Sequence, residues 1–184
     1  MAESLSKHLR QQCLDAIAER GMARIGLAGG STPMAAYADF AAFDMPWPQV
    51  RLVLIDERYV PLTDSQSNEA HIAAAFSGVS AHLGAWQGLY QAAQNIEQAA
   101  DAADAAIARF GLPLDVTVIG MGSDGHIASL FVESADFEAA MDIANPAAVL
   151  PIRFAPDAGK TGRLSFSLPA LLKTRHAVFC ITGA

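Results

Sequence analysis

Apolar positions recur with the period of a helix in some stretches of the chain and run continuously, as in buried strands, in others. The helical period predicts helices at residues 5–20, which end at Gly21, and at about 33–42, 67–76 and 96–110. Short apolar runs predict strands at 23–28, 51–55 and 114–120, and three more within 147–154, 163–168 and 176–183, with a turn of helix at 169–174. Strands that alternate with helices indicate an α/β domain with a mainly parallel central sheet flanked by helices, a Rossmann-like arrangement.

Three polar loops each follow the carboxyl end of an apolar predicted strand. They have the sequences GGSTP (29–33), DERYVP (56–61) and GMGSDGH (120–126). In open parallel sheets the carboxyl ends of the strands share one edge, and ligands bind there. We therefore expect the three loops to meet at one site.

Composition and charge narrow the classes of protein that remain. The 184 residues suit one domain, and 52% hydrophobic against 17% charged residues exclude a disordered chain. A net charge of −7 without a basic stripe excludes nucleic acid as an expected partner. Neither a signal peptide nor an apolar run near the roughly 20 residues of a membrane span is present, so we expect no membrane partner and a cytoplasmic location. Cys13 and Cys180 lie in apolar surroundings and are expected to be buried, reduced thiols.

The first loop, GGSTP, has the composition of a phosphate-binding turn. Gly29 and Gly30 allow a tight turn and the close approach of a ligand. Ser31 or Thr32 can cap the following helix, whose exposed amides, together with two hydroxyls, would cradle a phosphate. The alternative is a plain strand-to-helix turn. A nucleoside-triphosphate P-loop is disfavoured because no lysine accompanies these glycines at the required spacing.

The second loop places Asp56, Glu57 and Arg58 in succession at a strand end. The planar guanidinium of Arg58 can hold a phosphate or polarise a carbonyl oxygen. The alternative is a solvated turn with a surface ion pair. The residues of this segment alone do not decide between the two.

The third loop satisfies G-x-G-x-x-G with Gly120, Gly122 and Gly125, the spacing of a dinucleotide-binding turn. Such a turn normally introduces a full helix and a second strand that ends in an acid. Here the helix after Gly125 is predicted to be short and no such strand follows, so a nicotinamide site is disfavoured. The alternative uses side chains. His126 at the start of the short helix would act as a base near neutral pH, and Asp124 would orient it or contact a hydroxyl.

Other catalytic arrangements find little support in the sequence. No spacing of histidine or cysteine resembles a metal site, and no G-x-S-x-G elbow indicates a Ser-His-Asp hydrolase. We therefore expect neither a metal nor a cofactor.

Five segments, taken together and in order, resemble the 6-phosphogluconolactonase family. They are LAGGSTP, LIDERYVP with SNEAH, VIGMGSDGHIASLF, GRLSFSLPALLKTRH and ITGA. The resemblance runs from about residue 10 to the last residue, and the GMGSDGHIASLF block is highly specific. It implies an α/β fold of the sugar-phosphate isomerase/deaminase type with a sugar-phosphate site at the strand ends. It also implies hydrolysis of 6-phospho-D-glucono-1,5-lactone to 6-phospho-D-gluconate in the pentose phosphate pathway, without an obligatory cofactor.

The resemblance implies roles for individual residues. His126 matches the histidine proposed as general base, and Asp124 matches the acid beside it. The residues that would bind substrate are the phosphate loop Gly30, Ser31 and Thr32, the pocket arginines Arg58 and Arg163, and Asp56 at the sugar end of the site.

Two alternatives stand beside the lactonase interpretation. Glucosamine-6-phosphate deaminase, in the same superfamily, shares the GST, D-E and D-G-H elements, but its motif continues to F-N-E-P, whose glutamate assists ring opening. Phe131 stands at that position here and can transfer no proton. Ile127 is deaminase-like but supplies no acid in either enzyme. The other alternative is a sugar-phosphate-binding module without turnover.

The chain also departs from the family at its ends. It starts without a first short strand and stops at Ala184, before a segment that bears a phosphate-contacting lysine and closing helices. We interpret 1–184 as one 6-phosphogluconolactonase-like domain that lacks this segment, either an incomplete sequence or a shortened relative. The expected consequences are weaker phosphate capture and an exposed apolar part of the sheet, which favours self-association or instability. The sequence predicts no particular oligomeric state.

Overall fold

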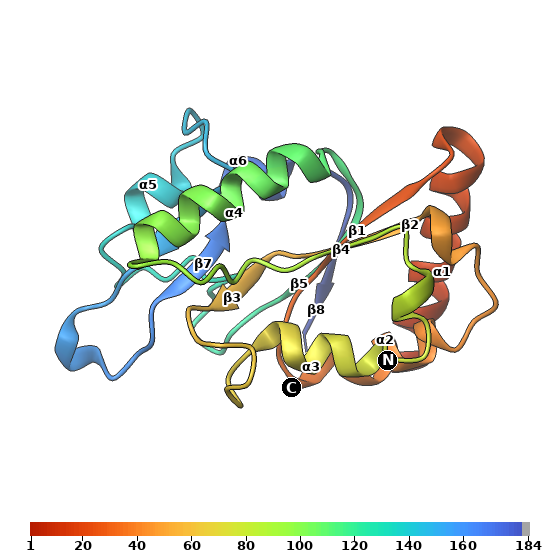
Figure 1. Ribbon diagram of the computed structural model, residues 1–184, viewed down its shortest axis with the longest axis horizontal. Coiled ribbons are helices and arrows are strands. Elements are labelled where there is room, and N and C mark those ends of the chain that lie inside the picture. Colours follow the sequence, from red (N-terminus) through yellow and green to blue (C-terminus); the bar gives the residue numbers. More distant parts are fainter. Residues whose placement is uncertain (182–184) are drawn as a thin grey trace.

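A five-stranded parallel sheet forms the centre of the molecule (Figure 1). The computed structural model describes residues 1–181, so the end of the ITGA motif lies outside the described residues. The strands, in spatial order, are β4 (Ala85–Gln87), β2 (Val50–Leu54), β1 (Ala23–Leu27), β5 (Leu114–Gly120) and β8 (Thr174–Cys180). All neighbouring pairs are parallel, which confirms the predicted central sheet.

Helices cover both faces of this sheet (Figure 1). On one side lie α1 (Ala2–Arg20), α2 (Ser31–Ala41) and α3 (Asn68–Ala75), and on the other side α4 (Ile96–Phe110), α5 (Phe137–Met141) and α6 (Leu168–Leu172). In β5 every residue except Gly120 is buried, as expected for a strand that is covered on both faces. Short 3-10 helices lie at Trp47–Gln49, Ser80–His82 and Pro156–Ala158.

A second sheet of three antiparallel strands adjoins the central one. Its strands, in spatial order, are β3 (Asp56–Arg58), β7 (Arg163–Phe166) and β6 (Val149–Ile152). Ile55 joins the two sheets, because its N–H donates to the Leu27 carbonyl at 3.1 Å and its own carbonyl accepts from the Phe166 N–H at 2.8 Å. The alternative of a solvated turn is therefore wrong for residues 56–58, which pair with β7.

The turn after β5 also differs from its prediction. No helix begins directly after Gly125, and the next one, α5, begins at Phe137. The chain turns back instead, and Met121 and Ile127 form an isolated antiparallel bridge. His126 therefore lies in a turn and not at the start of a helix.

The start of α2 tests its predicted cap. Gly30, with φ of 89°, is the N-cap of α2, so Ser31 and Thr32 already lie inside the helix and neither is its cap. At α3 the cap is Ser67, whose side chain accepts from the Ala70 N–H.

β8 lies at the edge of the central sheet, and the side chain of Phe179 on this strand is 51% exposed.

Cys13 and Cys180 are buried free thiols, as predicted. Within residues 1–181, no helix combines the length and the apolar character that crossing a bilayer requires.

Candidate active site

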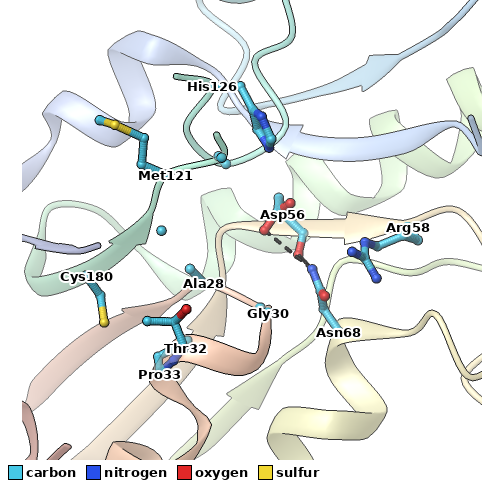
Figure 2. A pocket seen from close by; sticks show the side chains of 14 residues that line it. Ala28, Gly30, Thr32, Pro33, Asp56, Arg58, Asn68, Met121, His126 and Cys180 are labelled. Carbon is cyan, nitrogen blue, oxygen red and sulfur yellow. Dashed lines mark hydrogen bonds between the residues drawn. The ribbon is translucent and has the colours of Figure 1, made fainter. Parts of the chain in front are cut away.

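A pocket of about 200 Å³ lies at the carboxyl edge of the central sheet, where residues of all three polar loops meet (Figure 2). Its lining residues are Ala28, Gly29, Gly30, Thr32, Pro33, Asp56, Arg58, Asn68, Gly120, Met121, Gly122, His126, Ala128 and Cys180. The loops meet here because β1, β2 and β5 are parallel and end at the same edge.

The predicted site residues divide between this lining and its surroundings. Those in the lining are Gly30, Thr32, Asp56, Arg58 and His126. Outside it, Ser31 is exposed at the start of α2, and Asp124 contacts His126. Arg163 lies opposite Arg58 in the pairing of β7 with β3.

The imidazole of His126 is bound through one of its two nitrogens. Its Nδ1 lies 2.5 Å from Oδ1 of Asp124. A carboxylate only accepts hydrogen bonds, so Nδ1 carries a proton, and in the neutral imidazole Nε2 then keeps a lone pair. Figure 2 shows the ring extending into the pocket on the side of Asp56. The same hydrogen bond lowers the pKa of Asp124, which favours the carboxylate that this arrangement needs.

Glycines make this arrangement of the third loop possible. Gly125 has φ of 86°, in the left-handed region, and its N–H donates to the Gly122 carbonyl at 3.0 Å. A Cβ on Gly122 would lie 2.3 Å from Cε1 and 2.4 Å from Nδ1 of His126, and 2.5 Å from Oδ1 of Asp124. The glycine at 122 thus leaves the space that the hydrogen-bonded pair occupies.

Asp56 places a buried carboxylate in the middle of the pocket (Figure 2). Its Oδ2 accepts from the Ser129 hydroxyl at 2.7 Å, and Asn68 Nδ2 donates to its backbone carbonyl at 3.1 Å. Burial raises the pKa of Asp56, and the Ser129 hydrogen bond and the charges of Arg58 and Arg163 oppose this effect. Both arginines that the site is expected to use thus act on one carboxyl group.

We expect the parent chain to gain stability relative to an Asp56→Asn variant as the pH falls. Burial raises the folded-state pKa of Asp56 above its ordinary value of 3.8, so the folded chain takes up a proton at a higher pH than the unfolded chain. The contribution of this group to the free energy of unfolding therefore rises as the pH falls through the raised pKa and is complete below 3.8. Urea unfolding of both chains from about pH 7 to about pH 4 measures the difference. A difference that is constant, or that shifts toward the variant at acid pH, contradicts burial as the dominant cause.

Glu57 and Asn68 are residues of this region whose roles the sequence did not predict. Glu57 is fully buried, and its carboxylate accepts from the N–H groups of Asn68 at 2.7 Å and Glu69 at 2.6 Å, at the start of α3. Burial raises the pKa of Glu57, while these hydrogen bonds oppose the shift. The Glu57 carboxylate anchors α3 and thereby holds Asn68 beside Gly29. A Cβ on Gly29 would lie 2.1 Å from the Asn68 side chain. The sequence does contain a signal for this contact. An acid stands at a strand end, and the helix start SNE that follows has free amides that need acceptors.

The two arginines differ in how their guanidinium groups are satisfied. Nη1 of Arg58 donates to the Gln66 carbonyl at 2.6 Å. Nη1 of Arg163 is buried and has no hydrogen-bond partner in the part of the chain that the structure describes. Burial and, after it, the nearby charge of Arg58 lower the pKa of Arg163. A buried cationic donor without a partner suits an anionic ligand.

The structure bears on two other kinds of site. Among residues 1–181, no three His, Cys, Asp or Glu side chains are grouped so that they could hold a metal ion. The G-x-G-x-x-G turn leads into no helix whose N-terminus could bind a pyrophosphate. This supports the preference for the side-chain interpretation of the third loop.

Comparison with known proteins gives consistent matches over the whole chain. Residues 1–184 match the family described as glucosamine-6-phosphate isomerases/6-phosphogluconolactonase. The 6-phosphogluconolactonase of Rhizobium meliloti (strain 1021) is 36% identical over 184 residues, which are 100% of this chain and 78% of that protein. The 6-phosphogluconolactonase of Mesorhizobium japonicum is 36% identical over 183 residues, 100% of this chain and 76% of that protein. A crystal structure of a 6-phosphogluconolactonase from Shewanella baltica OS155 has a TM-score of 0.91 at 28% identity, covering 100% of this chain and 77% of that one.

These matches confirm the fold class, the resemblance to 6-phosphogluconolactonases and the prediction of an enzyme. The roles of individual residues stay predictions. The chain belongs to the glucosamine-6-phosphate isomerase/6-phosphogluconolactonase family.

Proposed function

We propose that this chain hydrolyses 6-phospho-D-glucono-1,5-lactone to 6-phospho-D-gluconate, as a step of the pentose phosphate pathway, with His126 as general base. The observation that carries the proposal is the 2.5 Å contact between His126 Nδ1 and Asp124, which leaves the Nε2 lone pair for the pocket. Relatives that match the whole chain bear the name 6-phosphogluconolactonase, which supports this substrate.

The reaction needs one proton carrier and one group that stabilises negative charge. Nε2 of His126 takes a proton from water while the water oxygen bonds to the lactone carbonyl carbon. The carbonyl oxygen becomes an oxyanion, which Arg58 or the loop amides stabilise. When the tetrahedral intermediate collapses, the bond from carbon to the ring oxygen breaks and His126 returns its proton to that oxygen. No covalent intermediate with the enzyme is required.

The phosphate is held by groups that are separate from the base. The first amides of α2, with Ser31 and Thr32, supply donors at the positive end of a helix of 11 residues. Arg163 supplies the buried donor described above. Anchoring the phosphate in this way fixes the position of the lactone ring relative to the imidazole. This fixed orientation contributes to the rate.

The deaminase alternative is less well supported by the site. Its reaction needs a carboxyl group at the position of Phe131, and this ring is buried against the imidazole of His126. An apolar ring there cannot exchange a proton with a sugar.

Product formation by the purified chain tests the proposed function. We expect 6-phospho-D-gluconate to form from the phosphorylated lactone faster than in the enzyme-free control, and no ammonia to be released from glucosamine 6-phosphate. Ammonia release without lactone hydrolysis would favour the deaminase. Binding of 6-phospho-D-gluconate without hydrolysis of the lactone would favour the binding module instead.

Replacing Arg163 by alanine is expected to raise KM for the phosphorylated lactone by about 10- to 100-fold, with a smaller loss in kcat, because a charged hydrogen bond to the substrate is lost. The unphosphorylated glucono-1,5-lactone should show little change. Steady-state kinetics on both lactones measure the split. Arg109→Ala, which removes an exposed arginine of α4, is the matched control. Equal losses on the two lactones would contradict a phosphate-binding role for Arg163.

A further inference from the structure

The His126 imidazole has a second neighbour besides Asp124. The ring of Phe131 stacks on it, with ring centroids 3.9 Å apart and planes inclined by 31°. Phe131 is only 7% exposed, so its own position is set by the protein interior. The two rings come from the same loop after β5, five residues apart in a segment without regular secondary structure.

Two side chains hold Phe131 in turn. Phe154 meets it edge to face, with centroids 5.3 Å apart and planes at 70°. The Lys160 ammonium lies 4.6 Å from the centroid of the Phe131 ring and forms an ion pair with Glu133. Aromatic pairs in edge-to-face geometry and ammonium groups over a ring are both attractive arrangements. The ring that stacks on the imidazole is thus fixed from more than one direction.

The hydrogen bond to Asp124 alone does not fix the imidazole. The Asp124 side chain is 51% exposed, so water competes for its oxygens, and a single contact at Nδ1 still allows the ring to rotate about it. A base must point its lone pair at the attacking water within a narrow range of geometry. A flat surface against the imidazole restricts the rotation that the hydrogen bond leaves open.

We propose that Phe131 is a positioning residue, whose stacked ring holds the imidazole of His126 in the plane that directs Nε2 into the pocket. The proposal rests on the proposed function, in which His126 is the base. Phe131 touches no reacting atom in this role. It acts through the imidazole and raises kcat without contributing to substrate binding.

The test compares two leucine variants in the same aromatic cluster. Phe131→Leu removes the ring that stacks on the imidazole, and we expect kcat to fall by about 10- to 100-fold while KM stays within about twofold. Phe154→Leu removes only one support of Phe131 and leaves both the ring that stacks on the imidazole and its contact with Lys160, so kcat should fall by much less, by about threefold at most. Phe131→Tyr keeps the aromatic plane and should restore most of the lost kcat. If Phe131→Leu does not fold, Phe131→Met makes the same comparison with a flexible apolar side chain.

A readout that does not depend on activity is the tautomer of His126. Nitrogen-15 spectra of the imidazole should show one tautomer in the parent and in Phe154→Leu, with the proton on Nδ1. In Phe131→Leu the two nitrogen shifts should move toward each other, because a ring that is no longer held exchanges between tautomers.

The outcomes separate this proposal from the function on which it rests. Equal losses of kcat in Phe131→Leu and Phe154→Leu would overturn the positioning role in favour of general packing. An unchanged kcat and tautomer in Phe131→Leu, with a large loss in His126→Ala, would overturn the positioning role and leave the proposed function intact. Full activity in a folded His126→Ala variant would instead overturn the proposed base.

Discussion

A His126→Ala variant is expected to lose about 10²- to 10⁴-fold in kcat for lactone hydrolysis, the range that a positioned general base contributes. The pocket itself should survive, because the imidazole is only partly buried and the phosphate-binding groups lie on other elements. KM for the phosphorylated lactone should therefore change little. Steady-state kinetics, with circular dichroism to confirm the fold, measure the effect.

A matched control tests whether the loss belongs to this imidazole. His82→Ala, which removes an exposed imidazole in a 3-10 helix, should keep the parent rate. Parent-like activity in a folded His126→Ala variant would remove His126 from the mechanism.

The sequence predicts best those elements whose signals are local. The alanine-dense helix at 96–110 and the strand at 114–120 have the bounds that the pattern predicts. The helix shows one apolar face and a cap at Asn95, whose side chain accepts from the Gln98 N–H. The strand is mostly apolar and is buried on both faces, including its polar residues Asp115 and Thr117. In both cases the pattern of apolar residues and the signals at the two ends indicate the same element.

Short strands that depend on distant partners are harder to predict. β4 has only three residues, each half-buried, and it exists because it pairs with β2 about 34 positions earlier in the chain. β3 consists of Asp56, Glu57 and Arg58, a composition typical of a turn, and it pairs with β7 more than 100 positions later. Nothing within either segment indicates its partner strand.

Some features of the candidate site can likewise be predicted from the sequence, and others cannot. The three polar loops meet because parallel strands end at one edge, which follows from topology that the sequence already indicates. The surroundings of Asp56 do not follow from it, because acidic residues are usually exposed and the hydroxyl of Ser129 comes from 73 positions later. The sequence identifies Phe131 only as the residue that replaces a glutamate. Its place against the imidazole is visible only in the structure.

A Gly122→Ala variant is expected to lose about 10²-fold in kcat, the penalty that a misplaced catalytic group can carry. The added Cβ would lie 2.3 Å from Cε1 of His126 and 2.5 Å from Oδ1 of Asp124, so the hydrogen-bonded pair must move apart or shift as a unit. Both atoms belong to side chains at the rim, so we expect these side chains to yield before the strand beneath them does.

The measurements that check this variant are kcat, the His126 tautomer and the thermal unfolding temperature. Gly78→Ala is the matched control, because a Cβ at that position meets nothing within 4 Å. The three atoms nearest to the methyl group at 122 belong to the base and its partner. A variant that retains kcat would therefore show that the contact between Nδ1 and Asp124 is not needed for turnover. A loss of kcat with parent-like unfolding would place the defect in the orientation of the imidazole and not in the stability of the fold.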